Sequence, residues 1–446
     1  MNVSRVACLV GWLAATALAA IAPVSLALQP APTLTSDATN GIWANFPKLD
    51  AAQPFLDYSK AWPARVGEGS DRGICIDILG PTLRPSGAAV WATPDAAPAA
   101  NDPDAKALFE KFHLPLDSKI ALEGERAFVV SVPKLPDGPL PPRRYTNPAA
   151  MTFRFVSARE TTRDGAKVYA LDHTVFTYFE PRSGKPKALV LLLPGLLATP
   201  EGTLSGLTDA LRARGYAVLR MVAQPARFVE HVTIVADPAK PDASTGEINE
   251  LFSQRLAECA YAAKGGLDHL AKAHPELGTL PLAAIGFSGG AISLPTIAAL
   301  EPDRYKAAVM VGGGAHLWQM QEFSNYSSMI GALDITWTAP ATDAAKQAIR
   351  DAYSKGVPLD PLHTAAALRG KPMLIIQGDV DLAVPSPLGD CLWERLGKPE
   401  RWLEHAGHED VFIHLPAKFA KIADWLDGAL GIRDASPAKE GVTSTP

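Results

Sequence analysis

The stretch that decides the fold spans residues 280–290 and reads Leu-Pro-Leu-Ala-Ala-Ile-Gly-Phe-Ser-Gly-Gly. Its apolar first part, Leu280 to Ile285, predicts a buried strand, and the small residues after Gly290 suit a helix. Between them stands Gly-x-Ser-x-Gly, a pattern typical of a tight strand-to-helix turn that holds a serine hydroxyl out at the end of a sheet. A side chain at either flanking glycine would collide with the neighbouring strand or helix. The stretch therefore predicts Ser288 as a nucleophile.

The pattern by itself is weak evidence, because a chain with 35 glycines contains it by chance roughly once in several such proteins. A serine hydroxyl also needs a base within hydrogen-bond reach before it acts as a nucleophile near neutral pH. A neutral histidine serves best, and a buried carboxylate must hold its tautomer. Residues elsewhere in the chain must therefore supply these groups.

Strands and helices alternate regularly around this stretch. Ala188 to Leu193 is a continuous apolar run, typical of a strand buried on both faces. Leu204, Leu207 and Leu211 recur on one face of a helix that Gly215 ends. The other predicted elements are a hairpin of strands 151–156 and 167–179 with its turn at 163–165, strands 216–222, 307–311, 373–377 and 401–403, a helix 248–274 interrupted at Gly265-Gly266, and helices 343–354, 388–396 and 411–430. The alternation predicts an α/β fold over residues 150–432, with a mostly parallel sheet and helices on both faces.

The N-terminal residues predict export. Residues 1–27 have the features of a secretory signal: Arg5 supplies a positive end, Val6 to Ala22 are almost continuously apolar, and Ser25-Leu26-Ala27 offer a cleavage site. The alternative is a membrane anchor, for which the apolar run is slightly short. We therefore expect a secreted or periplasmic protein with no stable membrane span after signal removal. Residues 28–149, rich in proline and alanine, predict an N-terminal accessory region, and residues 433–446 a disordered tail.

Composition favours a globular protein and argues against nucleic acid as a partner. Hydrophobic residues make up 47% of the chain, which is ample for a large core, and the net charge of −5 shows no basic excess. Cys75, Cys259 and Cys391 remain after signal removal, so at most one intramolecular disulfide is possible, and Cys259 lies on an apolar helical face that predicts a buried thiol. No spacing resembles a zinc or haem site, no phosphate loop occurs, and Gly312 to Gly314 lack dinucleotide-site spacing. We expect no metal and no cofactor.

Two loops after Ser288 can supply the acid and the base. The predicted strand 373–377 leads into a loop with Asp379 and Asp381, and the predicted strand 401–403 leads into a loop with His405 and His408. Functional residues of open α/β sheets lie on such loops, at the carboxyl ends of strands. The chain order is serine, aspartate, histidine, and on these grounds alone both members of each pair remain candidates.

With these three motifs in order, residues 150 to 430 resemble an α/β-hydrolase. The resemblance implies Asp381 as the acid, because it lies three residues after a glycine and shortly before Val-Pro, and His408 as the base, because it follows a glycine before the final helix. It also implies an oxyanion hole from the backbone N–H groups of Gly289 and Leu196. The family often has His-Gly at the second loop, whereas this chain has Pro194-Gly195, which keeps the N–H of Leu196.

Two features depart from a simple chain of strands and helices. Pro295 falls inside the helix after Ser288, where we expect a kink or a missing hydrogen bond. An insertion at about residues 315–362, after the sixth strand of the domain, resembles the cap that covers the site in many α/β-hydrolases. Of its residues His316, Trp318, Met320, Phe323, Tyr326, Met329 and Trp337, we expect most to pack the cap and one or two to line the pocket.

The resemblance implies a serine hydrolase that cleaves a carboxylic ester through an acyl-enzyme, with a small-molecule, acyl or peptidyl substrate. A serine peptidase of aminopeptidase type and a lipase or polyester depolymerase share the constellation and remain alternatives. A catalytically inactive binding protein is a further alternative, against which the complete serine, aspartate and histidine set argues. The sequence leaves the substrate and the oligomeric state open.

Overall fold

The computed structural model describes residues 42–47, 49–67, 72–78, 89–90, 97–98, 103–113, 121–123, 129–130, 150–163, 165–196, 199–229, 232–326 and 333–432. The predicted signal and the predicted tail lie outside the described residues, so both remain predictions. The chain divides into two compact units, residues 1–45 and 46–446, and the elements below belong to the second. In the parts of the chain that the structure describes, no helix is long and apolar enough to cross a membrane.

A single mixed sheet forms the centre of the second unit. Its strands follow the order β1 (Ile74–Asp77), β6 (Met151–Arg163), β7 (Ala166–Phe179), β9 (Tyr216–Met221), β8 (Ala188–Leu193), β11 (Leu282–Phe287), β12 (Tyr305–Val311), β14 (Met373–Gly378) and β15 (Glu400–Glu404). The six strands from β9 to β15 are parallel, whereas β1, β6 and β7 are antiparallel to their neighbours in this order. The predicted mostly parallel sheet is thus confirmed.

Strand β8 shows why a continuous apolar run marks the middle of the sheet. Successive side chains of a strand point to opposite faces. Leu189, Leu191 and Leu193 accordingly join one buried cluster, and Val190 and Leu192 join the other. All six positions of the strand are buried, so each needs an apolar side chain.

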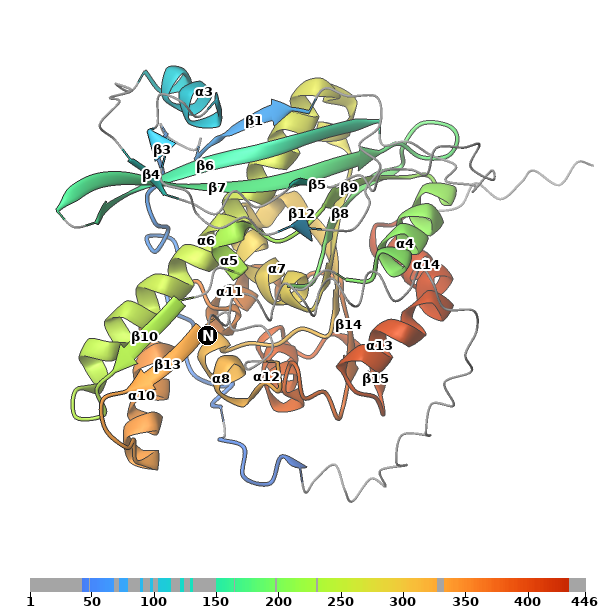
Figure 1. Cartoon of the computed structure of the whole chain (residues 1–446). Helices are drawn as coiled ribbons and strands as arrows, with labels where there is room; N and C mark the ends of the chain where they lie inside the picture. The colour runs from blue at the N-terminus through green and yellow to red at the C-terminus, as the bar shows by residue number, and fades with distance from the viewer. Residues whose placement is uncertain are drawn as a thin grey trace, which may run out of the picture. The chain divides into compact units, whose positions relative to one another are not determined.

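Helices cover both faces of the sheet, as predicted (Figure 1). One face packs against α4 (Glu201–Ala213), α13 (His408–His414) and α14 (Phe419–Ala429). The opposite face packs against α6 (Pro241–Ala273), α7 (Gly289–Leu300), α8 (Leu317–Phe323), α10 (Asp343–Gly356), α11 (Pro361–Thr364) and α12 (Ser386–Arg395). The remaining described elements are α3 (Pro103–Lys111), α5 (Ala226–Val229), strands β2 (Ala89–Val90), β3 (Ala97–Pro98), β4 (Ala121–Glu123), β5 (Val129–Val130), β10 (Val232–Ala236) and β13 (Leu333–Trp337), and short 3₁₀ turns at 275–279, 302–304, 365–368 and 415–418.

Two helix predictions are wrong. The expected interruption at Gly265-Gly266 is absent, and α6 runs unbroken through 33 residues. A Cβ on Gly265 would lie 2.4 Å from the ring of Phe155, so the glycines instead let the aromatic rings of the sheet pack onto the helix. Conversely, the single helix expected at 411–430 is divided into α13, a 3₁₀ turn and α14. Pro416 lies at that division and cannot donate the backbone hydrogen bond of a continuous helix.

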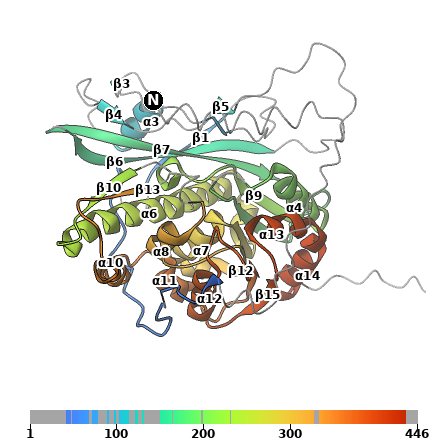
Figure 2. The ribbon, with the colours of Figure 1, turned by 60° about the horizontal axis from the view of Figure 1, so that its bottom comes forward.

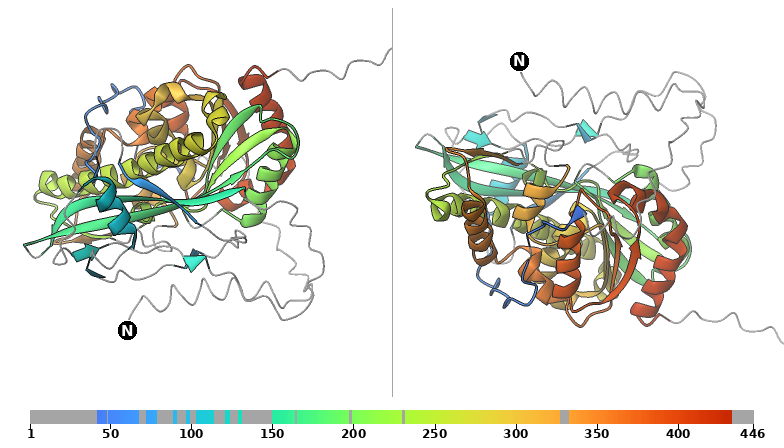
Figure 3. Two further views of the ribbon diagram at one scale, coloured as in Figure 1. Left: turned by 90° about the horizontal axis from the view of Figure 1, so that it is seen from above. Right: turned by 90° about the horizontal axis from the view of Figure 1, so that it is seen from below.

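The predicted hairpin is present, and N-terminal segments pack on it. Strands β6 and β7 pair from Met151 with Tyr178 to Arg163 with Ala166, and Gly165 at the turn has φ +77°. Strand β1 extends the sheet beside β6, and β4 pairs with β7. Helix α3 lies against the hairpin (Figures 2 and 3). Its side chains contribute to a third buried cluster there. Of the described strands of the predicted accessory region, β1, β3 and β4 therefore belong to the central sheet, whereas β2 and β5 pair with each other in a separate two-stranded sheet.

The insertion between β12 and β14 contains α8, β13, α10 and α11. Strand β13 does not join the central sheet but pairs in parallel with β10 as a separate two-stranded sheet. The predicted helix at 343–354 corresponds to α10. Pro295 lies inside α7, which nevertheless forms one helix from Gly289 to Leu300.

All three cysteines in the described part of the chain are free thiols, and Cys259 is fully buried as predicted. Its Sγ lies 3.4 Å from the side-chain oxygen of Gln224, and burial raises the pKa of the thiol well above its usual range. A buried thiol with a raised pKa is held in its unreactive protonated form.

Candidate functional site

The turn between β11 and α7 places Ser288 at the carboxyl end of the sheet. Ser288 has φ +47° and ψ −114°, a backbone conformation that residues with a side chain rarely adopt. The backbone N–H of Ser288 donates to the carbonyl of Val311 at 2.8 Å, and its carbonyl accepts from the N–H of Ile292 at 2.9 Å. These two bonds, one to the neighbouring strand and one to the following helix, hold the strained turn in place.

The two outer glycines of the motif are required by close approach of the backbone. A Cβ on Gly286 would lie 2.5 Å from the carbonyl oxygen of Gly290. A Cβ on Gly290 would lie 2.4 Å from the carbonyl oxygen of Leu193, in the adjacent strand β8. Both distances are far below van der Waals contact with backbone atoms that cannot move away. Only glycine therefore fits at either end of this turn.

Ser288, His408 and Asp381 form one continuous chain of hydrogen bonds. His408 Nε2 lies 2.9 Å from Ser288 Oγ, and His408 Nδ1 lies 2.6 Å from Asp381 Oδ2. The three residues follow β11, β15 and β14, whose carboxyl ends meet at the same edge because these strands are parallel. The structure thus brings together the three residues that the resemblance selected.

Asp381 is held as a hydrogen-bond acceptor. Its side chain is 1% exposed, and Oδ1 accepts the backbone N–H groups of Ala383 at 2.9 Å and Val384 at 2.8 Å. The other carboxylate oxygen then faces His408 Nδ1. This arrangement favours the tautomer in which Nδ1 carries the proton and Nε2 is free to accept one from Ser288.

The competing residues pair with each other instead. His405 Nδ1 lies 3.1 Å from both carboxylate oxygens of Asp379. The pair is at the surface, with 45% of the His405 side chain and 32% of the Asp379 side chain exposed. Neither residue is in the hydrogen-bond chain that reaches Ser288. Asp379 and Asp381 differ in their burial and in their backbone contacts, and both of these depend on how the whole chain folds.

The two backbone groups predicted for the oxyanion hole lie beside Ser288. The nitrogen of Leu196 is 3.0 Å from the place that a Cβ on Gly289 would occupy. Gly289 is the first residue of α7, so its N–H has no acceptor within the helix. The loop that carries Leu196 is fixed by two side chains that sequence reasoning missed. The hydroxyl of Thr199 accepts the N–H of Gly195 at 2.9 Å, and the amide of Gln224 donates to the carbonyl of Pro194 at 2.7 Å.

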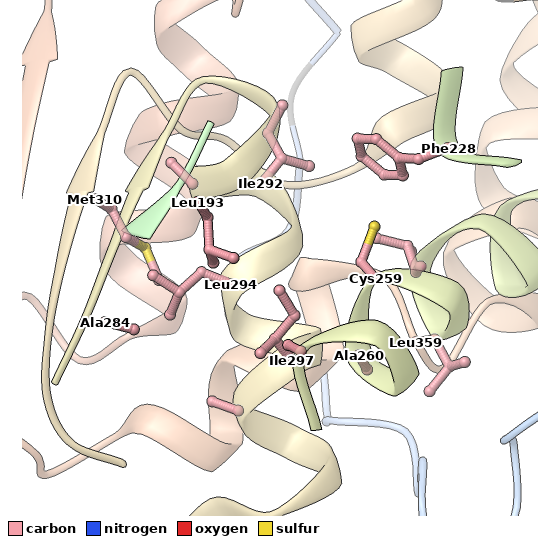
Figure 4. Packing of buried hydrophobic residues seen from close by; sticks show 14 of the residues in the cluster. Leu193, Phe228, Cys259, Ala260, Ala284, Ile292, Leu294, Ile297, Met310 and Leu359 are labelled. Carbon is pink, nitrogen blue, oxygen red and sulfur yellow. The ribbon is translucent and has the colours of Figure 1, made fainter. Parts of the chain in front are cut away.

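A pocket of about 540 Å³ opens in front of Ser288. Its apolar lining comes from several elements and comprises Leu196, Phe228, Phe252, Ile292, Leu317, Met320, Ala383, Val384, Phe412, Ile413 and Pro416, beside Pro200 and Gly195. Figure 4 shows Phe228 and Ile292 in the packed cluster that also contains Cys259, so this wall of the pocket continues the core of the protein. Of the described insertion residues named from the sequence, Met320 and Tyr326 line the pocket, and Met329 lies outside the described residues.

Apart from Tyr326, Ser288 and His408, the polar groups of the pocket were not found from the sequence. They are Thr199, Thr203, Arg255, Gln321, Ser324, Tyr326 and Glu409, besides Ser288 and His408. The hydroxyl of Tyr326 donates to the carboxylate of Glu409, and the Tyr326 ring stands edge-on to the imidazole of His408, with 5.9 Å between ring centroids. Arg255 lies on α6 and is 3% exposed. No local pattern marks these residues, because they meet only after distant segments have folded together.

Asp360 fixes the start of α8, which forms one wall of the pocket. Its buried carboxylate accepts the N–H of His316 at 2.8 Å, the N–H of Leu317 at 2.9 Å and the hydroxyl of Tyr353 at 2.6 Å. His316 has φ +66°, and burial lowers its pKa to about 4, so the imidazole is neutral near pH 7. The Nδ1 atom of this neutral ring accepts the N–H of Gln319 and caps the helix. The wall that carries Leu317 and Met320 is therefore set by buried polar contacts.

Within the residues that the structure describes, no group of three or more histidine, cysteine, aspartate or glutamate side chains is arranged to hold a metal ion.

No protein-family model matches this sequence. No curated protein matches it either.

Solved structures with a similar arrangement include esterases and a peptidase. A PEG-bound cold-adapted esterase from an Arctic intertidal metagenomic library is 16% identical, with 62% of this chain and 94% of that chain covered and a TM-score of 0.38. An esterase of Pyrococcus furiosus is 16% identical, with 62% and 91% covered and a TM-score of 0.39. An acylaminoacyl peptidase of Pyrococcus horikoshii is 12% identical, with 61% of this chain but 41% of that chain covered and a TM-score of 0.37.

The geometry of the site and of the sheet identifies the fold. A strained serine stands on a strand–turn–helix, the loop after β8 lies beside it, and the chain order is Ser288, Asp381, His408, each at the carboxyl end of a parallel strand. These are the defining features of one architecture. The chain has the α/β-hydrolase fold.

Proposed function

We propose that this protein is an exported serine hydrolase that cleaves a carboxylic ester. The observation that carries the proposal is the hydrogen-bond chain from Ser288 through His408 to Asp381, of which Ser288 and His408 line the 540 Å³ pocket. A serine, a histidine and a buried carboxylate in this order are the parts that acyl transfer needs.

Each of these residues would have its own role in the reaction. Ser288 Oγ attacks the ester carbonyl carbon while its proton passes to His408 Nε2, and Asp381 stabilises the imidazolium that results. The negative charge on the carbonyl oxygen is met by the N–H groups of Gly289 and Leu196. His408 then returns the proton to the departing alcohol, which leaves an acyl group on Ser288. In the second half, a water gives a proton to His408 Nε2 and its hydroxyl to the acyl carbon. The bond between the acyl carbon and Ser288 Oγ then breaks, His408 returns the proton to Oγ, and the acid is released.

The lining of the pocket favours an ester over a peptide. Most of its walls are aliphatic or aromatic side chains, which suit an acyl chain or an apolar alcohol. A peptidase of aminopeptidase type needs an anionic group for the substrate ammonium. Glu409 is the one acidic side chain among the described lining residues, and it is exposed and accepts the Tyr326 hydroxyl. A lipase or polyester depolymerase would use the same three residues on a longer substrate.

The function is tested by a panel of chromogenic esters of increasing chain length beside aminoacyl anilides, with wild type and Ser288→Ala compared. We expect ester hydrolysis that Ser288→Ala abolishes, and a fluorophosphonate probe that labels wild type at Ser288 but not the variant. Faster hydrolysis of anilides than of esters would instead assign the protein as a peptidase. Labelling that persists in Ser288→Ala, or a lack of any hydrolysis by folded wild type, would refute the proposal.

The export part of the proposal has its own test. It is supported by the residues Ser25-Leu26-Ala27 after an apolar run. N-terminal sequencing of protein recovered outside the cytoplasm should find a first residue near Leu28. An exported protein that still begins with Met1 would contradict cleavage at this position.

A further inference from the structure

Residues 194–196, which we call the oxyanion loop, contain a peptide unit that side chains bond at both ends. The carbonyl of Pro194 accepts from the amide Nε2 of Gln224 at 2.7 Å, and the N–H of Gly195 donates to the hydroxyl of Thr199 at 2.9 Å. In a planar trans peptide the C=O and N–H groups point in opposite directions. Gln224 and Thr199 therefore hold this unit from opposite sides and fix the orientation of its plane.

The orientation of that plane decides where the next N–H of the loop points. Glycine imposes few limits on its own φ and ψ, so Gly195 alone does not fix the peptide that follows it. That peptide carries the N–H of Leu196, whose nitrogen lies 3.0 Å from the place of a Cβ on Gly289. A donor of an oxyanion hole must lie within about 2.7–3.1 Å of the developing charge. A small rotation of the held unit would therefore move this N–H away from the oxyanion.

A buried thiol orients the Gln224 amide. The oxygen of an amide can only accept a hydrogen bond, and its nitrogen can only donate one. Cys259 Sγ lies 3.4 Å from Gln224 Oε1, and burial raises the pKa of the thiol well above its usual range, so the thiol keeps the proton that it donates. An amide turned the other way would point its oxygen at the carbonyl of Pro194. Both neighbours therefore select the same orientation of a side chain that is 1% exposed. Figure 4 shows Cys259 in the packed cluster with Leu193, the residue before the oxyanion loop.

We propose that Gln224 and Thr199 are positioning residues that place the N–H of Leu196 for the oxyanion. In this arrangement the Cys259 thiol orients the Gln224 amide. The inference rests on the proposed ester hydrolysis at Ser288. The contacts that carry it are made to the loop and act on a charge that exists only in the transition state. Loss of either contact should therefore lower kcat and leave KM nearly unchanged.

The test separates stabilisation of the oxyanion from binding of the substrate. The first readout is kcat and KM for 4-nitrophenyl hexanoate. The second is the preference of the enzyme for hexyl trifluoromethyl ketone over hexyl methyl ketone, given by the ratio of their inhibition constants. Ser288 Oγ adds to the carbonyl carbon of the trifluoromethyl ketone, its proton passes to His408 Nε2, and the carbonyl oxygen becomes an oxyanion. The methyl ketone resists this addition, so a misplaced N–H weakens mainly the first inhibitor.

Loss of either side-chain contact should give the same pattern. Gln224→Met removes the donor to the loop and should lower kcat by about 10- to 100-fold, the scale of a catalytic group misplaced by about 1 Å. Thr199→Val keeps the shape of the side chain without its hydroxyl and should act in the same direction. Thr199→Ser keeps the hydroxyl and should retain most of the wild-type kcat. The preference for the trifluoromethyl ketone should fall by the same factor as kcat/KM in the two deficient variants.

A double-mutant cycle tests the thiol. Cys259→Ala should lower kcat by about two- to fivefold, since a thiol is a weak donor, and Cys259→Ser should lower it less because a donor remains. In the Gln224→Met background, Cys259→Ala should have no further effect on kcat, because the amide that the thiol orients is absent. An equal loss of kcat in both backgrounds would refute the role of the thiol.

The control is Gln254→Met, which makes the same change at a buried glutamine of α6 that accepts from Arg65 and lies outside the described lining of the pocket. It should leave kcat and the inhibitor preference unchanged. Circular dichroism confirms the fold of each variant, and the two Thr199 variants decide the question if Gln224→Met does not fold.

Three results would overturn the inference. If Gln224→Met and Thr199→Val keep the wild-type kcat and inhibitor preference while Ser288→Ala is inactive, ester hydrolysis stands and the positioning role falls. If these variants raise KM alone, or weaken both ketones equally, the side chains act on substrate binding and the positioning role falls as well. If folded wild type hydrolyses no ester, or hydrolysis survives Ser288→Ala, the proposed function fails and this inference fails with it.

Discussion

Replacement of Asp381 by asparagine tests the division of labour in the site most directly. In the wild-type structure Asp381 Oδ1 accepts two backbone N–H groups and Oδ2 faces His408 Nδ1 at 2.6 Å. An asparagine of the same shape must keep its carbonyl oxygen toward those two donors. Its amide N–H₂ then faces His408 Nδ1, which can only accept. The proton of the imidazole moves to Nε2, where it points at Ser288 and can no longer take up the serine proton.

The expected loss is large because one hydrogen bond sets the tautomer. For this change in a serine, histidine and aspartate triad, a decrease of about 10⁴-fold in kcat is the known scale, equivalent to about 5.5 kcal/mol of transition-state stabilisation. Asp379→Asn is the matched control, since it makes the same chemical change two residues away. Asp379 pairs with exposed His405, and exposed ion pairs contribute about 0–1 kcal/mol to stability. Because Asp379 is also outside the hydrogen-bond chain that reaches Ser288, the control should change kcat by less than about fivefold.

The assay is steady-state hydrolysis of one good chromogenic ester by wild type and both variants, with circular dichroism to confirm the fold. His408→Ala should lose about as much activity as Ser288→Ala, and the double variant should be little worse than either, because the residues act as one unit. The reasoning is refuted if Asp379→Asn or His405→Ala causes the large loss of kcat while Asp381→Asn keeps more than about a tenth of wild-type kcat.

Three further predictions concern stability. Gly290→Ala places a Cβ 2.4 Å from the carbonyl of Leu193 and should lower the free energy of unfolding by about 1–3 kcal/mol or more, measured in urea; an unchanged stability would contradict the geometry of the turn. Arg65→Met leaves buried Glu258 without its 2.8 Å ion-pair partner and should lower the free energy of unfolding by about 3–5 kcal/mol. Lys106→Met breaks an ion pair in which both side chains are more than half exposed, so it should change the free energy of unfolding by less than about 0.5 kcal/mol. Equal effects of the two substitutions would refute the role of burial. Burial lowers the pKa of His316 from 6.5 to about 4, so the unfolded state binds more protons between these values, and the stability that is present above pH 6.5 falls as the pH decreases toward 4. Between pH 7 and pH 5 the free energy of unfolding of wild type should therefore fall by about 2 kcal/mol more than that of His316→Asn. Asparagine suits the positive φ of +66° and can still cap α8. Parallel pH profiles of the two proteins would refute this account.

The amino-acid sequence by itself determined the elements whose causes are local. The apolar run Ala188 to Leu193 predicts a doubly buried strand because every position of β8 contacts one of two cores. The glycines around Ser288 predict the turn because backbone atoms four or five residues away, or in the adjacent strand, exclude a side chain. Serine, aspartate and histidine each follow a predicted strand of a parallel sheet, so the sequence also places these residues together at the carboxyl ends of the strands.

Tertiary structure decided the features that depend on contacts between distant segments. Gly265-Gly266 resemble a helix interruption in the sequence, but rings of β6 and β7 pack onto them and α6 continues. Asp379 and Asp381 stand on the same loop with similar local surroundings. Asp381 is the one buried against His408, while Asp379 faces exposed His405. Arg255 resembles any other arginine of a helix until α5, α7 and α8 fold over it and bury it in the wall of the pocket, because burial exists only once the chain has folded.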